Sequence, residues 1–370
     1  CQGEKGLRLY RQMLEESKEP DSRTLMSILQ ALGGHIADME KPMEKASDKD
    51  REFLNERDLE IGQALHAYAK RKGLLYDVFV GNALVSMYGK CGAIKEAESL
   101  LVASTRQDVV SWTSLISGYA KYESGESALE CFERMKLKGV TPNAVTYVCS
   151  LTACGRVGET SKGEEIHAQM ESVETDIVVG NSLINMYAKF GMFGKANNVF
   201  DKLSVRNVVS WTALIAGYAQ RGESKKVFNM FEKMMYDGVR PNEVTFVSVL
   251  NACNHAGLVD KGRKYFETMR RDYGIMPNHK HYTCLIDLLG RAGQLNEASE
   301  LFKIMPYTHD RLVINSILGA CQKWDDVELG SETFGLVQNL DKMDHASFIL
   351  ISNIFAGGRS DKMKEKFVNA

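Results

Sequence analysis

The chain has 370 residues, of which 44% are hydrophobic and 25% charged, a composition typical of globular proteins that excludes intrinsic disorder and a collagen-like fold. Its 46 Lys and Arg residues are balanced by 48 Asp and Glu residues, so no overall positive field attracts it to nucleic acid or to an anionic membrane. No apolar run approaches the roughly 18 residues that a membrane helix needs, so we expect no membrane partner.

Residues 1–77 form the least regular part of the sequence. We expect residues 1–21 to be a partial helical repeat and residues 22–77 to be one copy with a charged insertion at about residues 34–60. This insertion contains many charges and few large apolar residues, which predicts a solvated loop. Because the chain begins at Cys1 rather than Met, we also expect the natural N-terminus and any targeting segment to be missing.

A long internal duplication follows. The segment VVSWTSLISGYAK from Val109 returns as VVSWTALIAGYAQ from Val208, an offset of 99 residues. GNALVSMYGKCG at Gly81 matches GNSLINMYAKFG at Gly180 with the same offset. Weaker repeats divide each duplicated unit into three copies, and a further copy follows the second unit. The expected limits are 78–108, 109–143, 144–176, 177–207, 208–242, 243–278 and 279–310.

Each copy has the pattern of two helices. In residues 109–143, apolar residues recur at helical spacing, Gly125 interrupts them, and a second apolar stripe runs to Gly139 and Pro142. A hairpin this small cannot bury both stripes alone, so neighbouring hairpins must stack. The sequence therefore predicts an all-α superhelical solenoid with a concave groove, in which Trp112 and Trp211 are packing residues.

The phrases GNALVSMYGKCG, VVSWTSLISGYAK, FERMKLKGVTPN and VTFVSVLNACNHAGLVDKG resemble pentatricopeptide-repeat proteins of plant organelles, in the class where long, short and ordinary repeats alternate. The resemblance implies a right-handed superhelix of helical hairpins. Residues 22–77, 144–176 and 243–278 would be long repeats, 78–108, 177–207 and 279–310 short repeats, and 109–143 and 208–242 ordinary repeats.

Residues 311–370 resemble the C-terminal E-type extension of the RNA-editing branch of this family. The resemblance rests on RLVINSILGACQKWDDVELG and HASFILISNIFAGGRSDKMKEK. The chain departs from that pattern at Ile314, where a Trp is usual. It also stops at Ala370, before the second extension motif would finish, so we expect a truncated extension.

The resemblance implies that the fifth and last residues of a repeat together recognise one RNA base. An ionised Asp only accepts hydrogen bonds and suits the ring N–H of uracil or guanine, whereas an Asn amide can pair with adenine or cytosine. By the family's code the pairs prefer uracil, adenine, a pyrimidine, adenine and guanine. These pairs are Asn82 with Asp108, Thr113 with Asn143, Asn181 with Asn207, Thr212 with Asn242, and Thr283 with Asp310.

The long repeats have apolar fifth residues, which cannot hydrogen-bond a base and should specify weakly or not at all. Their pairs are Met26 with Asp77, Val148 with Asp176, and Val247 with Asn278. The expected RNA element is 5′-U-A-n-Y-A-n-G-3′, parallel to the chain from Val78 to Asp310. Second-position residues would wedge between bases or would be ordinary helix-start hydrophobes; they are Phe79, Val110, Val145, Val178, Val209 and Val244, with Lys280 as a departure.

Cations recur at position 13 of the copies, eight residues after the fifth position and near the same helix face. They offer about one positive charge per repeat to a phosphate backbone, although solvated surface charges would give the same pattern. The candidates are Lys90, Lys121, Arg156, Lys189 and Arg291, while Gln220 and His255 break the series.

No motif for catalysis is present. The zinc deaminases of RNA editing need His-x-Glu with Pro-Cys-x-x-Cys, and neither occurs. We therefore expect no catalytic residue, no metal and no cofactor, and any deaminase would act in trans or belong to a missing C-terminal segment.

The resemblance favours a single-stranded RNA-binding protein that selects sites for cytidine-to-uridine editing in a mitochondrion or chloroplast. Its implied partners are editing-complex proteins such as the multiple organellar editing factors. An RNA splicing or stabilisation factor is an alternative that only the extension disfavours. A protein-binding scaffold of tetratricopeptide type is a third, but its groove should lack the Asn or Thr with Asp or Asn pairs.

Overall fold

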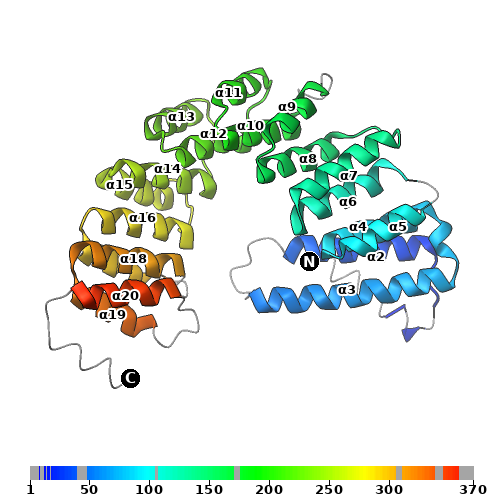
Figure 1. Ribbon diagram of the computed structural model, residues 1–370, viewed down its shortest axis with the longest axis horizontal. Helices are drawn as coiled ribbons and strands as arrows, with labels where there is room; N and C mark the ends of the chain where they lie inside the picture. The colour runs from blue at the N-terminus through cyan, green and yellow to red at the C-terminus, as the bar shows by residue number, and fades with distance from the viewer. Residues whose placement is uncertain are drawn as a thin grey trace. The chain divides into compact units, whose positions relative to one another are not determined.

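The computed structural model describes residues 18–39, 48–104, 107–170, 176–305, 311–337 and 345–357, with a few positions before residue 18. This part of the chain is built from α-helices with a short 3-10 helix and contains no β-strand (Figure 1). The expected all-α class is confirmed. The chain divides into two compact units, Cys1–Ser204 and Val205–Ala370.

In the first unit, a helix begins at the first residue of each expected copy from Val78 onward. A second helix follows after a short turn in every case. The elements are α2 (Ser22–Met39), α3 (Asp48–Arg71), η1 (Leu74–Tyr76), α4 (Val78–Cys91), α5 (Ile94–Ala103), α6 (Val109–Tyr122), α7 (Gly125–Leu137), α8 (Ala144–Val157), α9 (Thr160–Ala168), α10 (Ile177–Phe190) and α11 (Phe193–Lys202).

The second unit repeats this alternation and continues it into the expected extension. Its elements are α12 (Val208–Gln220), α13 (Ser224–Tyr236), α14 (Glu243–Ala256), α15 (Val259–Arg271), α16 (His279–Arg291), α17 (Leu295–Ile304), α18 (Arg311–Trp324), α19 (Val327–Val337) and α20 (His345–Gly357). No described helix is both long and apolar enough to cross a membrane.

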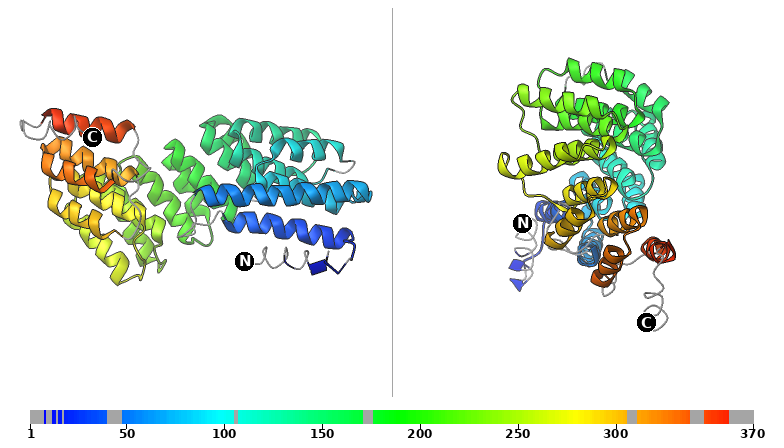
Figure 2. Two further views of the ribbon diagram at one scale, coloured as in Figure 1. Left: turned by 90° about the horizontal axis from the view of Figure 1, so that it is seen from below. Right: turned by 90° about the vertical axis from the view of Figure 1, so that its left-hand side faces the viewer.

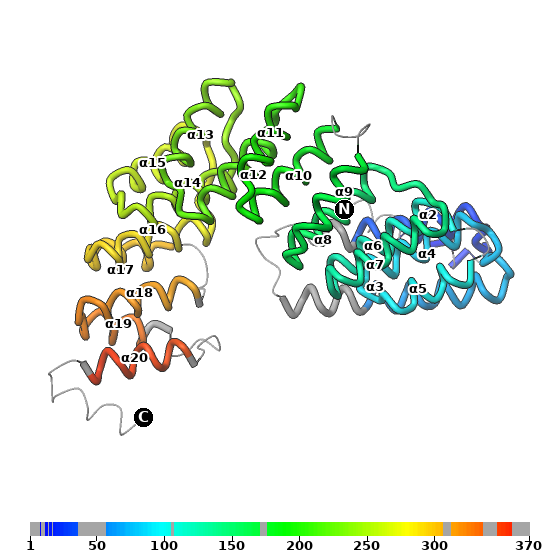
Figure 3. The backbone as a smooth tube through the Cα atoms, turned by 45° about the horizontal axis from the view of Figure 1, so that its top comes forward, coloured from blue at the N-terminus to red at the C-terminus, as the bar shows by residue number. Residues whose placement is uncertain are grey.

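Each unit has two layers of helices. The first helices of successive hairpins pack on one another, α4 on α6 and α6 on α8 in the first unit, and α14 on α16 and α16 on α18 in the second (Figure 3). Within a unit, a second helix packs on its own first helix and on the next one, as α7 does on α6 and α8. The side chains of Trp112 and Trp211 are 2% and 3% exposed in these layers, which confirms their expected packing role.

Small residues let the first helices approach closely. A Cβ atom at Gly118 of α6 would lie 3.1 Å from the carbonyl oxygen of Gly89 on α4, tighter than nearly all real contacts. A larger residue here would require α4 and α6 to move apart by a few tenths of an ångström. At the helix ends, Gly92 and Gly191 have φ angles of 81° and 75°, a left-handed conformation that suits a residue without Cβ and ends α4 and α10.

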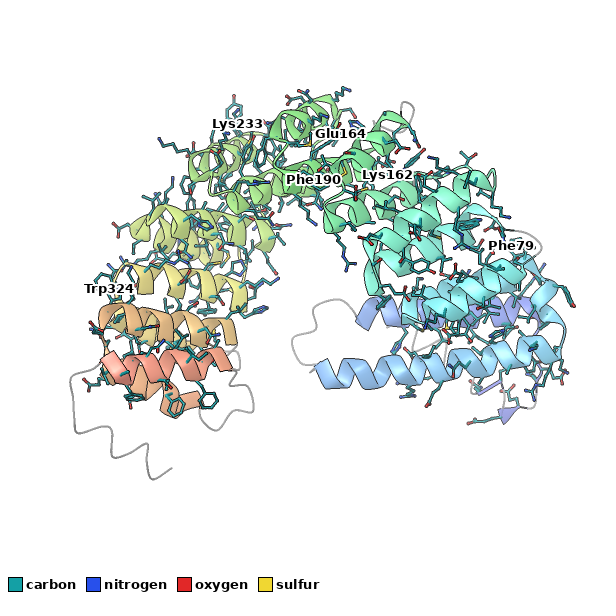
Figure 4. The ribbon with its side chains drawn as sticks, viewed as in Figure 1. Phe79, Lys162, Glu164, Phe190, Lys233 and Trp324 are labelled. Carbon is teal, nitrogen blue, oxygen red and sulfur yellow. The ribbon has the colours of Figure 1, made fainter. Side chains whose placement is uncertain are left out.

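Ion pairs join the second helices of successive hairpins. Lys195 on α11 pairs with Glu164 on α9 at 2.6 Å, and Figure 4 labels Glu164. In the second unit, Lys303 on α17 pairs with Glu332 on α19 at 2.7 Å. Such partly exposed pairs contribute only about 0–1 kcal/mol each, so apolar packing between the layers is the main source of stability.

The expected loop at residues 34–60 is wrong for most of its length. α2 extends to Met39 and α3 begins at Asp48, and residues 40–47 lie outside the described part. α3 prolongs the helix of residues 61–71, and adding good helix formers to an existing helix needs no new nucleus. Asp58 on α3 is 3% exposed and bonds the Nδ1 atom of His35 on α2 at 2.6 Å, which holds the two long helices side by side (Figure 2).

Candidate nucleic-acid interface

The last residue of an expected repeat caps the first helix of the next one. Asp108 Oδ1 accepts hydrogen bonds from the backbone N–H groups of Val110 and Ser111, both at 3.0 Å. Such caps satisfy N–H groups that have no partner within the helix. Because Oδ1 faces the helix start, the other oxygen or the amide nitrogen of each capping side chain faces away from it. The same capping role falls to Asp77, Asn143, Asp176, Asn207, Asn242 and Asn278.

The structure brings one predicted pair into direct contact. The amide Nδ2 of Asn82 donates a hydrogen bond to Oδ2 of Asp108 at 2.6 Å. The carboxylate thus accepts at both oxygens, and Oδ2 retains a lone pair while Asn82 retains a second amide hydrogen. Fifth and last residues therefore form one polar unit between α4 and α6.

In the two ordinary repeats a third residue bridges the pair. Thr146 donates to Asn143 Oδ1 at 2.9 Å, and its hydroxyl lies 2.6 Å from the Thr113 hydroxyl. Thr146 has a single hydroxyl hydrogen, so Thr113 must be the donor between the two hydroxyls and keeps its lone pairs as acceptors. The backbone N–H of Thr146 also donates to Asn143 Oδ1, which points the Asn143 NH₂ group the other way.

The second ordinary repeat repeats this arrangement in the other unit. Thr212 and Thr245 are joined at 2.8 Å, and Thr245 donates to Asn242 Oδ1 at 2.8 Å. Thr113 and Thr212 are only 8% and 7% exposed. Each of these sites therefore presents a small acceptor next to an amide donor, and little else of the fifth side chain is accessible.

The remaining two pairs are Asn181 with Asn207 and Thr283 with Asp310. Asn181 is 8% exposed on α10, and Asn207 caps α12 through Oδ1. Thr283 instead donates to the backbone carbonyl of His279 at 2.8 Å, because the residue three positions into the next helix is Val313 and offers no hydroxyl. Its expected partner Asp310 lies outside the described residues.

The fifth positions of the long repeats have the apolar surface expected of them. Met26, Val148 and Val247 are half-buried on α2, α8 and α14. Their side chains have no conventional hydrogen-bonding group that could select a base. Asp77, Asp176 and Asn278 nevertheless cap the following helices, so the last residue keeps its structural role where base recognition is not expected.

Exposure changes sharply from the second to the third residue of each first helix. On α4, Phe79, which Figure 4 labels, is 70% exposed, whereas Val80 is fully buried. The wedge interpretation requires a second-position side chain that is free to contact a base, and this exposure meets that requirement. The other second-position residues are 51–58% exposed: Val110, Val145, Val178, Val209 and Val244.

A concavity of about 320 Å³ brings together several of these features in the first unit. Its lining includes Asn82 and Asp108, the exposed residues Phe79 and Val110 on either side of them, and Lys90. A polar pair thus lies between two apolar side chains, with a cation at the same site. This is a suitable environment for a planar base with an attached phosphate.

The position-13 cations lie at the C-terminal ends of the first helices. Four of them are exposed on the first helices of successive hairpins, α4, α6, α8 and α10: Lys90, Lys121, Arg156 and Lys189. Their charges oppose the negative end of the helix dipole, and Arg156 also reaches the carbonyl of Lys121 at 3.4 Å. These cations therefore have a structural role in addition to any phosphate contact. Arg291 differs because Asp287 pairs with it at 3.1 Å.

Sequence reasoning missed the third-position residues that orient the capping amides. Thr146 and Thr245 are fully buried and bond both members of their pairs. Ser111 and Ser210 form capping boxes with Asp108 and Asn207. The signal was available, because Asn-x-x-Thr and Asp-x-x-Ser before an apolar run have the spacing of a capping box.

His281 takes the third position of α16 and is fully buried. Its Nδ1 atom accepts the backbone N–H of Asn278 at 3.1 Å, so Nε2 carries the proton and donates to the Glu243 carbonyl at 3.0 Å. Burial lowers the pKa of His281. Within the described ranges, no group of three or more His, Cys, Asp or Glu residues could hold a metal ion.

Comparison with family models identifies the repeat. The model of the PPR repeat family matches residues 107–156 and 206–255, and two PPR repeat models match residues 273–306 and residues 82–103, 181–208 and 244–273. Together these matches cover more than half of the chain. The chain belongs to the pentatricopeptide-repeat family. Its helical hairpins are therefore pentatricopeptide repeats.

Its relatives include organellar proteins of Arabidopsis thaliana. A pentatricopeptide repeat-containing protein named as mitochondrial is 33% identical over 377 residues, which cover 96% of this chain and 39% of that protein. One named as chloroplastic is 35% identical over 358 residues, which cover 95% of this chain and 38% of that protein. The chain thus spans less than half the length of these relatives.

Solved structures show the same fold. The crystal structure of the pentatricopeptide repeat protein PPR10 from maize matches with a TM-score of 0.70 and 16% identity, covering 99% of this chain and 56% of that one. PPR10 in complex with an 18-nt psaJ RNA element matches with a TM-score of 0.68 and 16% identity, covering 95% of this chain and 55% of that one.

Proposed function

We propose that this protein binds single-stranded RNA in a plant mitochondrion or chloroplast and selects cytidines for editing to uridine. The single observation that supports the binding most directly is the geometry of the fifth and last residues. In three pairs they are hydrogen-bonded to each other or bridged by one hydroxyl, beside exposed apolar second-position residues: Asn82 with Asp108, Thr113 with Asn143, and Thr212 with Asn242. Membership of the pentatricopeptide-repeat family and the likeness to an RNA-bound relative agree with this proposal.

The hydrogen-bond directions suit the bases that the family's code assigns. In the Thr113 and Asn143 pair, a hydroxyl acceptor lies next to an amide donor, which matches the N6 amine and N1 acceptor of adenine. In the Asn82 and Asp108 pair, a carboxylate acceptor lies next to an amide donor, which matches the N3–H and a carbonyl of uracil. These matches support the element 5′-U-A-n-Y-A-n-G-3′.

The finer assignment rests on sequence resemblance. We assign the chain to the class with alternating long, short and ordinary repeats, with the limits given above, and we assign residues 311–370 to a partial E-type extension. On this proposal the long repeats and the extension contact editing-complex proteins such as the multiple organellar editing factors. The deaminase is supplied by another protein or by a part of the whole protein outside this chain.

A binding titration tests the register of the RNA. Asn82→Thr with Asp108→Asn converts the first pair into the type found at Thr113 and Asn143, and an Asn at position 108 can still cap α6. At fixed salt, the variant should prefer adenine to uracil at the first nucleotide. The ratio of the two affinities should change by about tenfold, the effect of one well-placed base contact.

The matched control makes the same two kinds of substitution on the second helix α11, as Asn197→Thr with Asp201→Asn. This control should keep the uracil preference. The two RNAs compared have uracil or adenine at the first nucleotide. If the first variant and the unmodified protein show the same preference between them, the assigned register is contradicted. Equal, weak binding of the predicted RNA, its scrambled version and the matching DNA would contradict RNA recognition altogether.

A further inference from the structure

The hairpin of α18 and α19 is placed like the repeats before it, although the family models match only as far as residue 306. α18 packs on α16 and α17, and α20 packs on α18. α19 is joined to α17 by Lys303 and Glu332 at 2.7 Å, in the same way that α9 is joined to α11. The layered arrangement of the second unit therefore continues through residues 311–337 (Figure 3).

The start of α18 has the exposure pattern of a base-recognising helix. Leu312, at the second position, is 65% exposed, and Val313, at the third, is fully buried. The equivalent residues on α4 are Phe79 and Val80, with 70% exposure and full burial. A large apolar side chain that the fold leaves uncovered is thus present in α18 at the position of the apparent base wedges.

The fifth residue of α18 is also oriented by the third residue of the next first helix. Ser347 on α20 donates a hydrogen bond to Asn315 Oδ1 at 2.8 Å, as Thr146 and Thr245 bond the fifth residues Thr113 and Thr212. Since Oδ1 accepts this bond, the NH₂ group of Asn315 points away from Ser347 as a donor. The fifth residue of α18 thus has the same kind of contact as the fifth residues of α6 and α12.

The C-terminal end of α18 repeats a cation and an aromatic residue found at the end of α6. Lys323 Nζ donates to the carbonyl of Arg291 at 2.9 Å, and Trp324 Nε1 donates to that of Gly290 at 2.8 Å. On α6, the same two positions are Lys121 and Tyr122. Trp324, which Figure 4 labels, is 48% exposed. The Nζ atom of Lys323 lies 5.0 Å from the centroid of its ring.

We propose that α18 forms a further nucleotide-binding position, in which Leu312, Asn315 and Lys323 contact the ribonucleotide directly 3′ of the guanine in the predicted element. The proposal rests on the proposed RNA-binding function and its parallel orientation. Leu312 stacks on the base, Asn315 donates to an acceptor on its edge, and Lys323 contacts the phosphate. The hairpin thus lengthens the RNA footprint by one nucleotide.

The test compares three RNAs at fixed salt: the predicted element, the element with one added 3′ uridine, and the element with an abasic 3′ nucleotide. The added uridine should strengthen binding about fivefold over the abasic RNA, a gain at the lower end for a stacked and hydrogen-bonded base. Leu312→Ala should abolish this gain. Because Leu312 would also border the guanine, as Val110 borders the first base site, any loss for the unextended element is shared by all three RNAs and cancels in the ratio of the uridine RNA to the abasic RNA. Because Leu312 is exposed, the variant should fold normally, which its thermal unfolding will check.

Gln322→Ala is the matched control, since Gln322 is exposed on the same helix one residue before Lys323. This control should keep the full gain. A 4-thiouridine at the added position should also cross-link to a peptide that contains α18. If the protein binds the unextended element but shows neither gain nor cross-link, this proposal is overturned and α18 is left as a protein-contacting surface. If the unextended element does not bind, the proposed function itself fails.

Discussion

At the scale of single residues, one hydroxyl sets the chemistry of a candidate base site. Thr146 lies between Thr113 and Asn143 and bonds both. Without it, the Asn143 amide would keep one backbone contact, and the Thr113 hydroxyl could rotate. Thr146 would not touch RNA, so we interpret it as a positioning residue for both members of the pair.

Thr146→Val should therefore weaken discrimination at the second nucleotide of the predicted RNA. Valine fits this position, since Val80 and Val179 occupy it in the short repeats. We expect the adenine preference there to fall by about fivefold to tenfold, with a loss of about 1 kcal/mol in the free energy of unfolding for the lost hydrogen bonds. Competition titrations with adenine or guanine at that nucleotide measure the first effect and denaturant unfolding the second.

Ser150→Ala is the control on the same helix, since Ser150 is equally buried and its hydroxyl donates to the backbone carbonyl of Thr146. It should cost a similar amount of stability and leave base preference intact. A similar loss of preference in both variants would show that α8 responds to destabilisation in general, and that Thr146 has no specific positioning role.

At the scale of elements, the helix starts also connect stability to pH. Asn278 caps α16, and its backbone N–H donates to Nδ1 of His281, the third residue of that helix. Nδ1 of His281 must be unprotonated to accept this hydrogen bond. Burial lowers the pKa of His281, the charges of His279 and Lys280 act in the same direction, and Glu243 opposes them. The unfolded chain therefore binds a proton at higher pH than the folded chain does.

The free energy of unfolding should consequently fall as pH drops below about 6.5, the ordinary value for histidine, and should not change from this cause above it. His281→Ser should reduce this pH dependence, because Ser111 and Ser210 already form capping boxes at the same position. Urea unfolding at pH 7.5 and pH 5.0 measures the effect. His255→Ser, at an exposed site on α14, is the control and should keep the pH dependence of the unmodified protein. If His281→Ser loses as much stability between pH 7.5 and pH 5.0 as the unmodified protein does, His281 is not the cause of the pH dependence.

The elements also show how far the sequence alone could lead. Periodic apolar residues and the Asp or Asn before each first helix were enough to predict the helical hairpins, because both are local signals. The helix at residues 48–60 was not predictable in this way, since its composition resembles that of a solvated loop. Its stability depends on continuation into residues 61–71 and on the contact of Asp58 with His35 across two helices.

The candidate site was predictable as a set of positions but not as a set of contacts. Asn82 and Asp108, which bond directly, are 26 positions apart in the sequence. Thr113 and Thr146, which form the bridge, are 33 positions apart and belong to different hairpins. Whether second-position hydrophobes are covered is likewise decided by the neighbouring hairpin. The value of Phe79 and Val110 as wedges therefore became apparent only from their exposure.

At the scale of the whole molecule, the proposed binding of RNA must be reconciled with a formal charge of −2. We propose the position-13 cations as the answer, because they place positive charge locally at the ends of successive first helices while acidic residues compensate elsewhere. If Lys90, Lys121, Arg156, Lys189 and Arg291 each neutralise one phosphate, the logarithm of affinity should fall with the logarithm of salt with a slope of about −3.5.

This slope distinguishes phosphate contacts from ordinary surface charges. Lys189→Gln should make it shallower by about 0.7 and weaken binding to all single-stranded RNAs alike, because a phosphate contact has no base preference. Arg291→Gln should have a smaller effect, since Asp287 already offsets its charge. Lys95→Gln, on the exposed surface of the second helix α5, removes the same charge away from the first helices and should leave the slope unchanged. If Lys95→Gln and Lys189→Gln flatten the slope equally, the protein attracts RNA through its general field, and the position-13 residues serve only to stabilise helix ends.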